Sequence, residues 1–219
     1  MRLGTAKAPA IRVAVIESDP LRTIGFHAML DSQREFELTS HASWEAIQGN
    51  ANIDVALLGN LYGHNLFDVM ADLRERKPEL PILVVGSEIN DEAILKAIAS
   101  GARGYVDEAA PSAELANAIR VVSAGITWAP RRVLSMFVDR ASASFRRASP
   151  VSRQDFTTRE RQVLEMLVAG KSNKEIALPL GIEERTVKAH VAKLIRKVGA
   201  HNRVTLSVHA ITQSLVSAK

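Results

Sequence analysis

The chain has 219 residues, of which 28 are Lys or Arg, 24 are Asp or Glu and none is Cys. An apolar fraction of 47% with 24% charged residues excludes a disordered or fibrous chain. The lack of cysteine excludes disulfides and thiolate metal sites, and no apolar run reaches the roughly 18 residues of a membrane span. The first residues also lack the apolar core of a secretion signal, so we expect a cytoplasmic protein without membrane contact.

Charge is divided unevenly between the two parts of the chain. Residues 1–129 hold 11 basic against 17 acidic side chains, a balance of −6, whereas residues 130–219 hold 17 against 7, a balance of +10. Such an asymmetry predicts two domains, the second of which faces a polyanion.

Short apolar runs alternate with amphipathic stretches up to about residue 122. In chain order they predict five strand–helix pairs: Ile11–Ile16 with Leu21–Leu30, Phe36–Thr39 with Ser43–Gln48, Ile53–Leu58 with Leu66–Arg76, Pro81–Val85 with Asp91–Ala99, and Gly104–Val106 with Pro111–Val122. Five such units predict an α/β fold, a doubly wound parallel sheet whose ligand crevice lies at the carboxyl ends of the strands.

The pattern changes from about Gly125 onwards. Pro130–Asp139 predicts a connecting helix, and the Ser-, Ala- and Arg-rich stretch Ala141–Gln154 predicts an exposed linker. An all-helical segment follows. The predicted division is a sheet domain over residues 9–127, a linker helix and linker over 128–153, and a helical domain over 154–219.

Two capping boxes, Thr157–Glu160 and Ser172–Glu175, begin the first two helices of the last segment, and Gly181 precedes a third that begins near Glu184. This order is typical of a helix-turn-helix unit. One face of the third helix is apolar, and the other gathers basic and small residues: Arg185, Lys188, Ala189, Ala192 and Arg196. Long basic side chains reach phosphates and base edges, although a merely solvated basic face is the alternative.

These residues also carry a family resemblance. The runs Phe156-Thr157-Thr158-Arg159-Glu160, Gly170-Lys171-Ser172-Asn173-Lys174-Glu175-Ile176-Ala177, Leu180-Gly181-Ile182 and Thr186-Val187-Lys188-Ala189-His190-Val191 closely resemble the LuxR-type DNA-binding domain. The resemblance covers nearly all of residues 156–216. With the strand–helix array in front, the whole chain resembles a NarL/FixJ-type response regulator, in which a CheY-like receiver precedes a four-helix LuxR-type domain.

The resemblance implies that the helix over Glu184–Lys197 enters the major groove of double-stranded DNA. Lys188 and Ala189 would then face base edges, with Ala192 nearby. Phosphate contacts are expected from a further set: Asn173, Lys174, Thr186, Lys193 and Arg203. Two departures bear on docking, because Glu183 takes the usual serine cap position of this helix and Pro179 lies inside the preceding one.

Two surfaces are candidates for a homodimer contact. The last helix carries an apolar stripe of Val204, Val208, Ile211 and Leu215, which in the family contributes to dimer contacts but could equally close the core of its own domain. The second surface is the face formed by Asp91–Ala99, Pro111–Val122 and the strand between them, which such receivers use to dimerise. We expect a dimer that reads two half-sites.

The phosphorylation pocket that the family requires is almost entirely missing. Aligned by its strands, the acid pair falls on Glu17-Ser18, with Asp19 one place later, and the aspartate acceptor position is Gly59. The hydroxyl position is Gly86, followed by Ser87, and the lysine position is Glu108. We therefore predict an atypical, aspartate-less receiver without metal, cofactor or catalytic residues.

Other interpretations of this pocket remain open. Asp19, Asp54 or Asp68 could be a relocated acceptor, and Glu17, Asp19 and Glu108 could together bind a divalent cation. Tyr105 stands at the position of the family's switch aromatic, or is an ordinary half-buried tyrosine.

The sequence as a whole predicts a DNA-binding transcription regulator that acts without aspartyl phosphorylation. The alternative is an interaction or ligand-sensing module whose receiver-like domain gates a partner regulator. The regulator is expected to be either a constitutive dimer or one gated by a regulatory protein or a small ligand at the receiver-like domain. An enzyme is not expected, because no strand end presents a nucleophile with its base.

Overall fold

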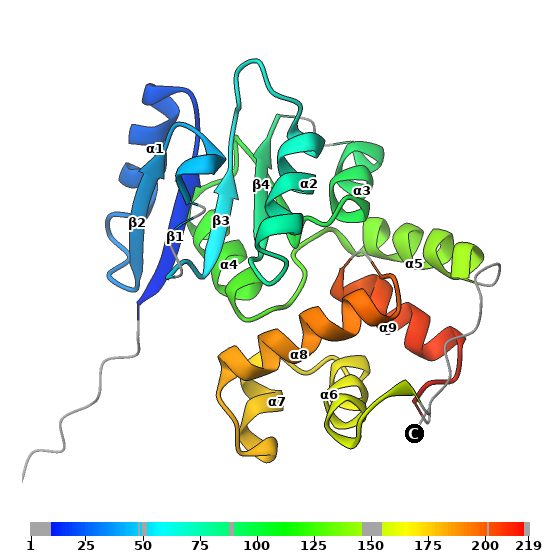
Figure 1. Cartoon of the computed structure of the whole chain (residues 1–219). Coiled ribbons are helices and arrows are strands. Elements are labelled where there is room, and N and C mark those ends of the chain that lie inside the picture. Colours follow the sequence, from blue (N-terminus) through cyan, green and yellow to red (C-terminus); the bar gives the residue numbers. More distant parts are fainter. Residues whose placement is uncertain are drawn as a thin grey trace, which may run out of the picture.

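The computed structural model of the chain describes residues 10–47, 49, 52–87, 90–145, 155–200 and 202–216. These residues form a sheet covered by helices and, next to it, a group of four helices (Figure 1). This arrangement confirms the predicted fold class.

The sheet has five parallel strands in the order β2-β1-β3-β4-β5. Their bounds are β1 Ile11–Ile16, β2 Phe36–His41, β3 Val55–Leu58, β4 Ile82–Gly86 and β5 Gly104–Asp107. The order reverses at β1, and the crevice of such a sheet lies at the strand ends beside this reversal. Glu17, Gly59 and Gly86 all stand at or just beyond the carboxyl ends of their strands.

Helices cover both faces of the sheet because successive residues of each buried strand point to opposite sides. One face packs against α1 (Pro20–Leu30) and α4 (Ser112–Ser123), and the other against α2 (Leu66–Arg76) and α3 (Asp91–Ala99). On β3, for example, Leu57 faces the first pair and Leu58 faces the second.

The second strand–helix unit differs from the prediction. In place of a helix over Ser43–Gln48, a single 3₁₀ turn spans Trp44–Ile47, and Gln48 lies outside the described residues. The segment is too short to complete an α-helix, and 3₁₀ geometry is the usual solution for such short pieces. Its position is fixed by Trp44, whose Nε1 donates to Asp72 of α2 at 2.9 Å.

The connecting helix is longer and less independent than the sequence indicates. Helix α5 spans Arg131–Phe145, so residues 141–145 are helical rather than exposed linker, and residues 146–154 lie outside the described part. Val133 and Phe137 are buried in the core on the α2 and α3 face of the sheet. Ahead of the helix, Trp128 forms a parallel bridge with Gly104 of β5. Residues 128–137, at the start of the segment that the sequence assigns to a linker, therefore pack with the sheet domain.

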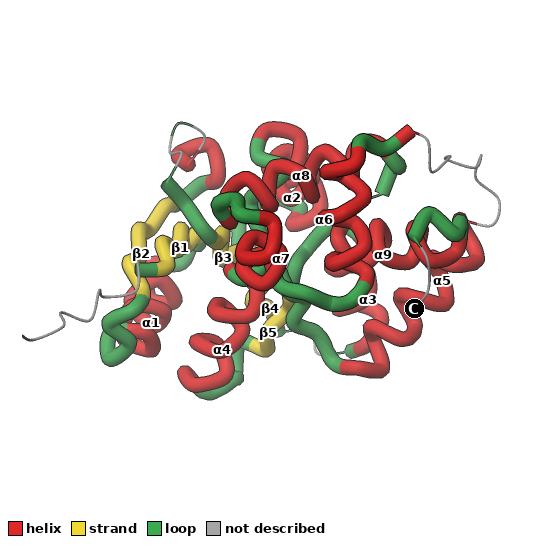
Figure 2. The backbone as a smooth tube through the Cα atoms, turned by 90° about the horizontal axis from the view of Figure 1, so that it is seen from below, coloured by secondary structure: helices red, strands yellow, loops and turns green. Residues whose placement is uncertain are grey.

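The helical domain has a core of its own, drawn from all four of its helices. Their bounds are α6 Thr158–Val168, α7 Asn173–Leu180, α8 Glu184–Lys197 and α9 Arg203–Thr212. Helix α9 packs along α5, and α8 lies below the amino ends of the strands (Figures 1 and 2). The carboxyl ends, with Gly59 and Gly86, lie at the opposite end of the sheet.

Candidate functional site

The helix-turn-helix unit begins as the sequence predicts. Thr157 and Glu160 form a reciprocal capping box at α6, and Ser172 and Glu175 form another at α7. Gly181 ends α7 in the left-handed conformation, with φ of 62°, which allows the tight turn into α8. Glu183 caps α8 without a side-chain hydrogen bond, so the first turn of this helix lacks the usual support.

Helix α8 has the two faces that were predicted. Val187 and Leu194 are completely buried in the core of the helical domain, and Val191 is nearly so. Of the residues assigned to DNA contact, six are exposed: Lys174, Arg185, Thr186, Ala189, Lys193 and Arg196. Lys188 is half-buried, and three are buried: Asn173, Ala192 and Arg203. The buried ones face the sheet domain, which the sequence did not predict.

The contact between the two domains, here called the seam, is made by polar groups of α7 and α9. The Asn173 backbone N–H donates to the carbonyl of Ala124 at 3.1 Å. The Asn202 side chain donates to the carbonyl of Ile98 at 2.7 Å. Gly125 allows the close approach, because a Cβ added there would lie 2.5 Å from Nδ2 of Asn173.

Arg203 completes the seam from the side of the helical domain. Its guanidinium donates to Oδ1 of Asn173 at 3.2 Å and to the carbonyl of Lys171. Burial lowers the pKa of Arg203 to about 10. Arg103 of the sheet domain is similarly affected, because burial first, and then the charges of Arg203 and Arg74, lower its pKa to about 10. The seam thus holds two arginines, one from each domain, whose like charges oppose its closure.

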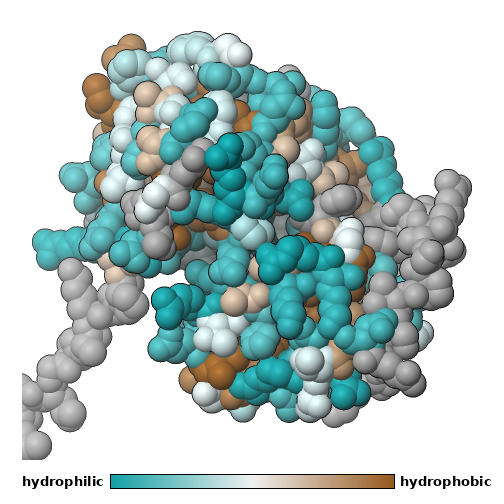
Figure 3. All heavy atoms as spheres, in the orientation of Figure 1, coloured by the Kyte–Doolittle hydropathy of each residue, from teal (hydrophilic) through white to brown (hydrophobic). Residues whose placement is uncertain are grey.

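A cleft of about 1030 Å³ continues the seam toward the amino ends of β1 and β3. Helix α8 contributes Arg185 and Lys188, and the sheet domain contributes Arg12 and Asp54. Asp54 accepts two bonds from the Arg12 guanidinium at 2.9 and 3.1 Å. Burial alone would raise the pKa of Asp54, but these bonds, with Lys188 adding to them, hold it below its usual range. Hydrophilic side chains line both sides of the domain boundary (Figure 3).

This geometry bears directly on DNA. The sequence predicts that α8 presents Lys188 and Ala189, with Ala192 nearby, to a major groove. Ala189 is exposed, but Lys188 and Ala192 line the contact with the sheet domain. The arrangement of the two domains is therefore incompatible with insertion of this face of α8 into DNA. Binding in that mode requires the domains to separate.

Lys193 has a partner that the sequence did not reveal. Its Nζ lies 2.9 Å from Oε1 of Glu160, and Nζ of Lys197 lies 2.9 Å from Oε2. Burial of the Glu160 side chain would raise its pKa, but Lys197, the Thr157 N–H and Lys193 together lower it to about 2. The capping glutamate of α6 therefore also fixes two lysines of α8.

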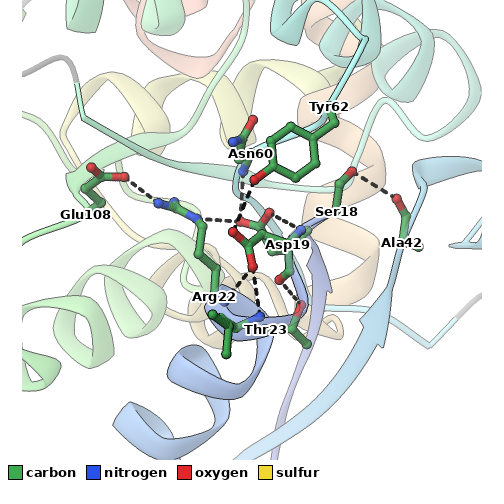
Figure 4. Close-up of polar contacts among 10 residues, drawn as sticks. Ser18, Asp19, Arg22, Thr23, Ala42, Asn60, Tyr62 and Glu108 are labelled. Atoms are coloured by element: carbon green, nitrogen blue, oxygen red, sulfur yellow. Dashed lines mark hydrogen bonds and ion pairs between the residues drawn. The ribbon is translucent and has the colours of Figure 1, made fainter.

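At the carboxyl ends of the strands, the Glu17 carboxylate is the centre of a closed polar network. The Glu17 side chain is fully buried. Its Oε1 accepts from the Asp19 N–H at 2.8 Å, and its Oε2 accepts from the Asn60 N–H at 2.8 Å. Oε2 also accepts from Nε of Arg22 at 2.9 Å, and the same guanidinium reaches Glu108 (Figure 4).

At the two glycines at these strand ends, Gly59 and Gly86, another side chain occupies the space that a Cβ would take. A Cβ added to Gly59 would lie 2.1 Å from Oε2 of Glu17, and a Cβ added to Gly86 would lie 2.3 Å from the hydroxyl of Tyr105. Tyr105 is buried, with its ring turned toward Gly86. Neither strand end offers a side chain, and neither has room for one.

The remaining residues of the predicted pocket have other roles. Asp19 caps α1 by accepting from the Leu21 N–H at 2.8 Å and also accepts from the Tyr62 hydroxyl at 3.1 Å. These bonds, led by that of Leu21, hold the pKa of Asp19 below its usual range. Ser18 donates to the carbonyl of Ala42 at 3.4 Å, and Ser87 is exposed.

Of the three relocated acceptors considered, only Asp19 lies at the pocket. Asp54 is at the amino end of β3, and Asp68 is in the first turn of α2. Arg22 was missed by the sequence reasoning. Burial would lower its pKa, but Glu108 and Glu17 outweigh this effect and raise it.

Both candidate dimer surfaces are occupied within the chain. Of the predicted stripe, Val204, Val208 and Ile211 lie on α9, whereas Leu215 lies beyond its end at Thr212 and is buried in the core of the helical domain. Val208 is buried, Val204 packs against the sheet-domain core, and only Ile211 is exposed. The α3 part of the other surface lies under α5. Arg132 and Arg140 of α5 pair with Asp91 at 2.7 Å and with Glu92 at 2.9 Å, respectively. A second copy could reach the α9 residues that face the sheet domain only after the domains separate, and the α3 surface only if α5 also moved away.

Within the described residues, no group of three His, Asp or Glu side chains is placed to hold a metal ion. No helix in this part of the chain is long and apolar enough to cross a membrane.

The chain is similar to bacterial transcription regulators over most of its length. Residues 154–210 match the family of bacterial regulatory proteins, luxR family. The DNA-binding transcriptional activator DevR/DosR of Mycobacterium tuberculosis is 35% identical over 161 residues, which cover 73% of each chain. Transcriptional regulatory protein LiaR of Bacillus subtilis is 28% identical over 94% of this chain and all of that protein. A two-component response regulator of the LuxR family from Aurantimonas sp. SI85-9A1 shares the fold, with a TM-score of 0.53 and 18% identity over 60% of this chain and 97% of that one.

Proposed function

The chain belongs to the response regulators with a LuxR-type DNA-binding domain, and we propose that it regulates transcription without being phosphorylated on aspartate. The observation that carries this proposal is Gly59. An acyl phosphate needs a carboxylate, and this position has no side chain and no space for one, because Oε2 of Glu17 lies where a Cβ would extend.

DNA recognition is assigned to α8 and its neighbours. Lys188 supplies a base-edge contact from the centre of the helix, whereas exposed residues such as Arg196 contact phosphates. The seam must open first, since Lys188 and Ala192 cannot lie against the sheet domain and face DNA at once. Opening would also uncover Val204 of α9, which packs against the sheet-domain core, and we expect the DNA-bound form to be a two-fold dimer on paired half-sites that uses this helix.

Random-sequence selection on the untreated protein tests the DNA assignment. We expect one enriched sequence with two half-sites, bound with an affinity that falls steeply with salt. Lys188→Ala should relax the preference at one base of each half-site, while Arg196→Ala should weaken all sequences about equally. Enrichment of no sequence would favour the alternative, a module that gates a partner regulator.

A separate assay tests independence from phosphorylation. Operator affinity is measured with and without acetyl phosphate and Mg²⁺, and the intact mass of the protein is recorded in parallel. We expect an unchanged mass and an unchanged affinity. Addition of a phosphoryl group together with tighter binding would refute the proposal. Sedimentation with operator DNA checks the dimer, for which we expect two chains per site.

A further inference from the structure

The resemblance to receivers implies a divalent cation at the carboxyl ends of the strands, but the residues of this pocket do not fit one. Both oxygens of Glu17 already accept hydrogen bonds, from the N–H groups of Asp19 and Asn60 and from Arg22. Asp19 is engaged by the first turn of α1 and by Tyr62. A cation would have to compete with these donors, and with the positive charge of Arg22, for the same oxygens.

We propose that Arg22 takes the place of the cation: its guanidinium bridges Glu17 and Glu108 as a permanent counter-ion, so the receiver-like domain neither binds nor needs a divalent metal. This inference rests on the proposed function in one respect, since a receiver that is not phosphorylated has no use for the metal.

The position of Arg22 suits this role. It lies in the first turn of α1, one turn from the end of β1, and its side chain crosses the pocket toward the loop after β5 (Figure 4). Nε donates to Glu17, and a terminal nitrogen donates to Glu108. These two carboxylates are 91 positions apart in the sequence. A guanidinium has the forked donors for such a bridge, and a lysine does not.

The surroundings keep the guanidinium in place. Its side chain is only 26% exposed, and its central carbon lies 6.0 Å from the centre of the Phe26 ring. Because Arg22 is tethered to the chain, its local concentration at the pocket is fixed and cannot be diluted as a free ion can. Millimolar metal must displace both ion pairs in order to enter.

The bridge also connects the end of β1 to the loop after β5, because Gly59 and Gly86 have no side chains that could do so. It links the end of β1 to Glu108, whose backbone N–H donates to the carbonyl of Gly86 at 3.1 Å. Gly86 is the residue over which the Tyr105 hydroxyl lies. Arg22 is thus a positioning residue for the loop after β5 as well as a counter-ion.

The test measures thermal stability of the full chain against added Mg²⁺ for the wild type, Arg22→Ala and Arg34→Ala. Arg34 is exposed in the loop before β2 and serves as the control for loss of one positive charge. We expect Mg²⁺ to raise the Tm of Arg22→Ala by at least about 3 °C, the effect of tenfold saturation on a domain of this size, and to leave the other two unchanged. Adding Glu17→Gln to Arg22→Ala should abolish the rise.

A folded Arg22→Ala protein that responds to Mg²⁺ no more than Arg34→Ala would overturn the assignment. The wild type gives a second test that does not depend on any variant folding. Mn²⁺ should leave the amide NMR signals of Ser18 and Asn60 as sharp as those far from the pocket, and selective broadening there would contradict the exclusion. Failure of the proposed function would appear in a different assay, as transfer of a phosphoryl group to the protein. If Arg22 acts as we infer, Mn²⁺ would still leave the signals of Ser18 and Asn60 sharp in that case.

Discussion

Substituting alanine for Gly59 tests whether Glu17 fills the acceptor position. The backbone of Gly59 is not left-handed, so the methyl group itself is the only perturbation. It would lie 2.1 Å from Oε2 of Glu17, whereas real Cβ atoms essentially never approach another heavy atom within 3.0 Å. The carboxylate must therefore move by about 1 Å in a packed interior.

The cost follows from the bonds on the displaced oxygen. Oε2 accepts from Asn60 at 2.8 Å and from Arg22 at 2.9 Å, and the buried carboxylate has no access to water that could replace them. Hydrogen bonds to charged groups contribute roughly 1.5–3 kcal/mol each, so losing one or partly losing both costs about 2–4 kcal/mol. Alanine returns roughly 0.4–1 kcal/mol by restricting the unfolded chain. We expect a net loss of about 2–3 kcal/mol, which corresponds to a fall of roughly 10 °C in the Tm of the sheet domain.

Scanning calorimetry of the full chain measures this transition, and Gly25→Ala is the matched control. Gly25 lies in α1 with nothing within 4 Å of an added Cβ, so that substitution should leave the Tm unchanged or raise it. In a Glu17→Ala background, Gly59→Ala should cost little, because the obstructing carboxylate is gone. A Gly59→Ala protein within about 0.5 kcal/mol of wild type, the usual scatter of neutral substitutions, would refute the placement of Glu17.

Three further outcomes are expected. Gly125→Ala should force Asn173 away from the seam and tighten operator binding several-fold in a mobility-shift assay, whereas Gly170→Ala, with a similar positive φ but open space, should not. The folded-state pKa of Glu160 is about 2 against an ordinary 4.5, so its stabilisation of about 3 kcal/mol is present above pH 4.5 and lost as pH falls toward 2. Glu160→Gln should flatten that part of the stability profile in acid titrations followed by circular dichroism. Phe137→Ala should destabilise the sheet domain by about 3–5 kcal/mol in calorimetry, because α5 belongs to its core.

The sequence predicted the features that depend on local pattern. The alternation of short apolar runs with amphipathic stretches located the strands. The spacing of Thr157 with Glu160 and of Ser172 with Glu175 identified the residues at which two helices start. The missing side chain at Gly59 was also visible, because a strand end is a local feature. Each of these structural features is determined by residues that lie within a few positions of it in the sequence.

Features that depend on long-range docking left no such signal. Arg22 in the first turn of a helix looks like any exposed arginine, and its partner Glu108 is 86 residues away. A helical projection places Ala192 opposite the core of its own domain but cannot show that another domain covers it. The same holds for Arg203, whose charge predicted a phosphate contact and whose observed partners are backbone and amide oxygens.

The seam and the strand-end pocket lie at opposite ends of the sheet, and this separation decides how DNA binding can be controlled. If the pocket closed by Glu17 and Arg22 takes no phosphoryl group, as we propose, the equilibrium between the closed and the open seam is set by contacts at the seam itself. There the attraction between Asp54 and Lys188 favours closure, and the proximity of Arg103 and Arg203 opposes it. The apparent affinity for DNA is the affinity of the open form multiplied by its population, so every 1.4 kcal/mol of seam stability reduces binding about tenfold. In the proposed mode, DNA competes with the sheet domain for the face of α8 that carries Lys188, and a site that engages this face therefore opens the seam by mass action alone.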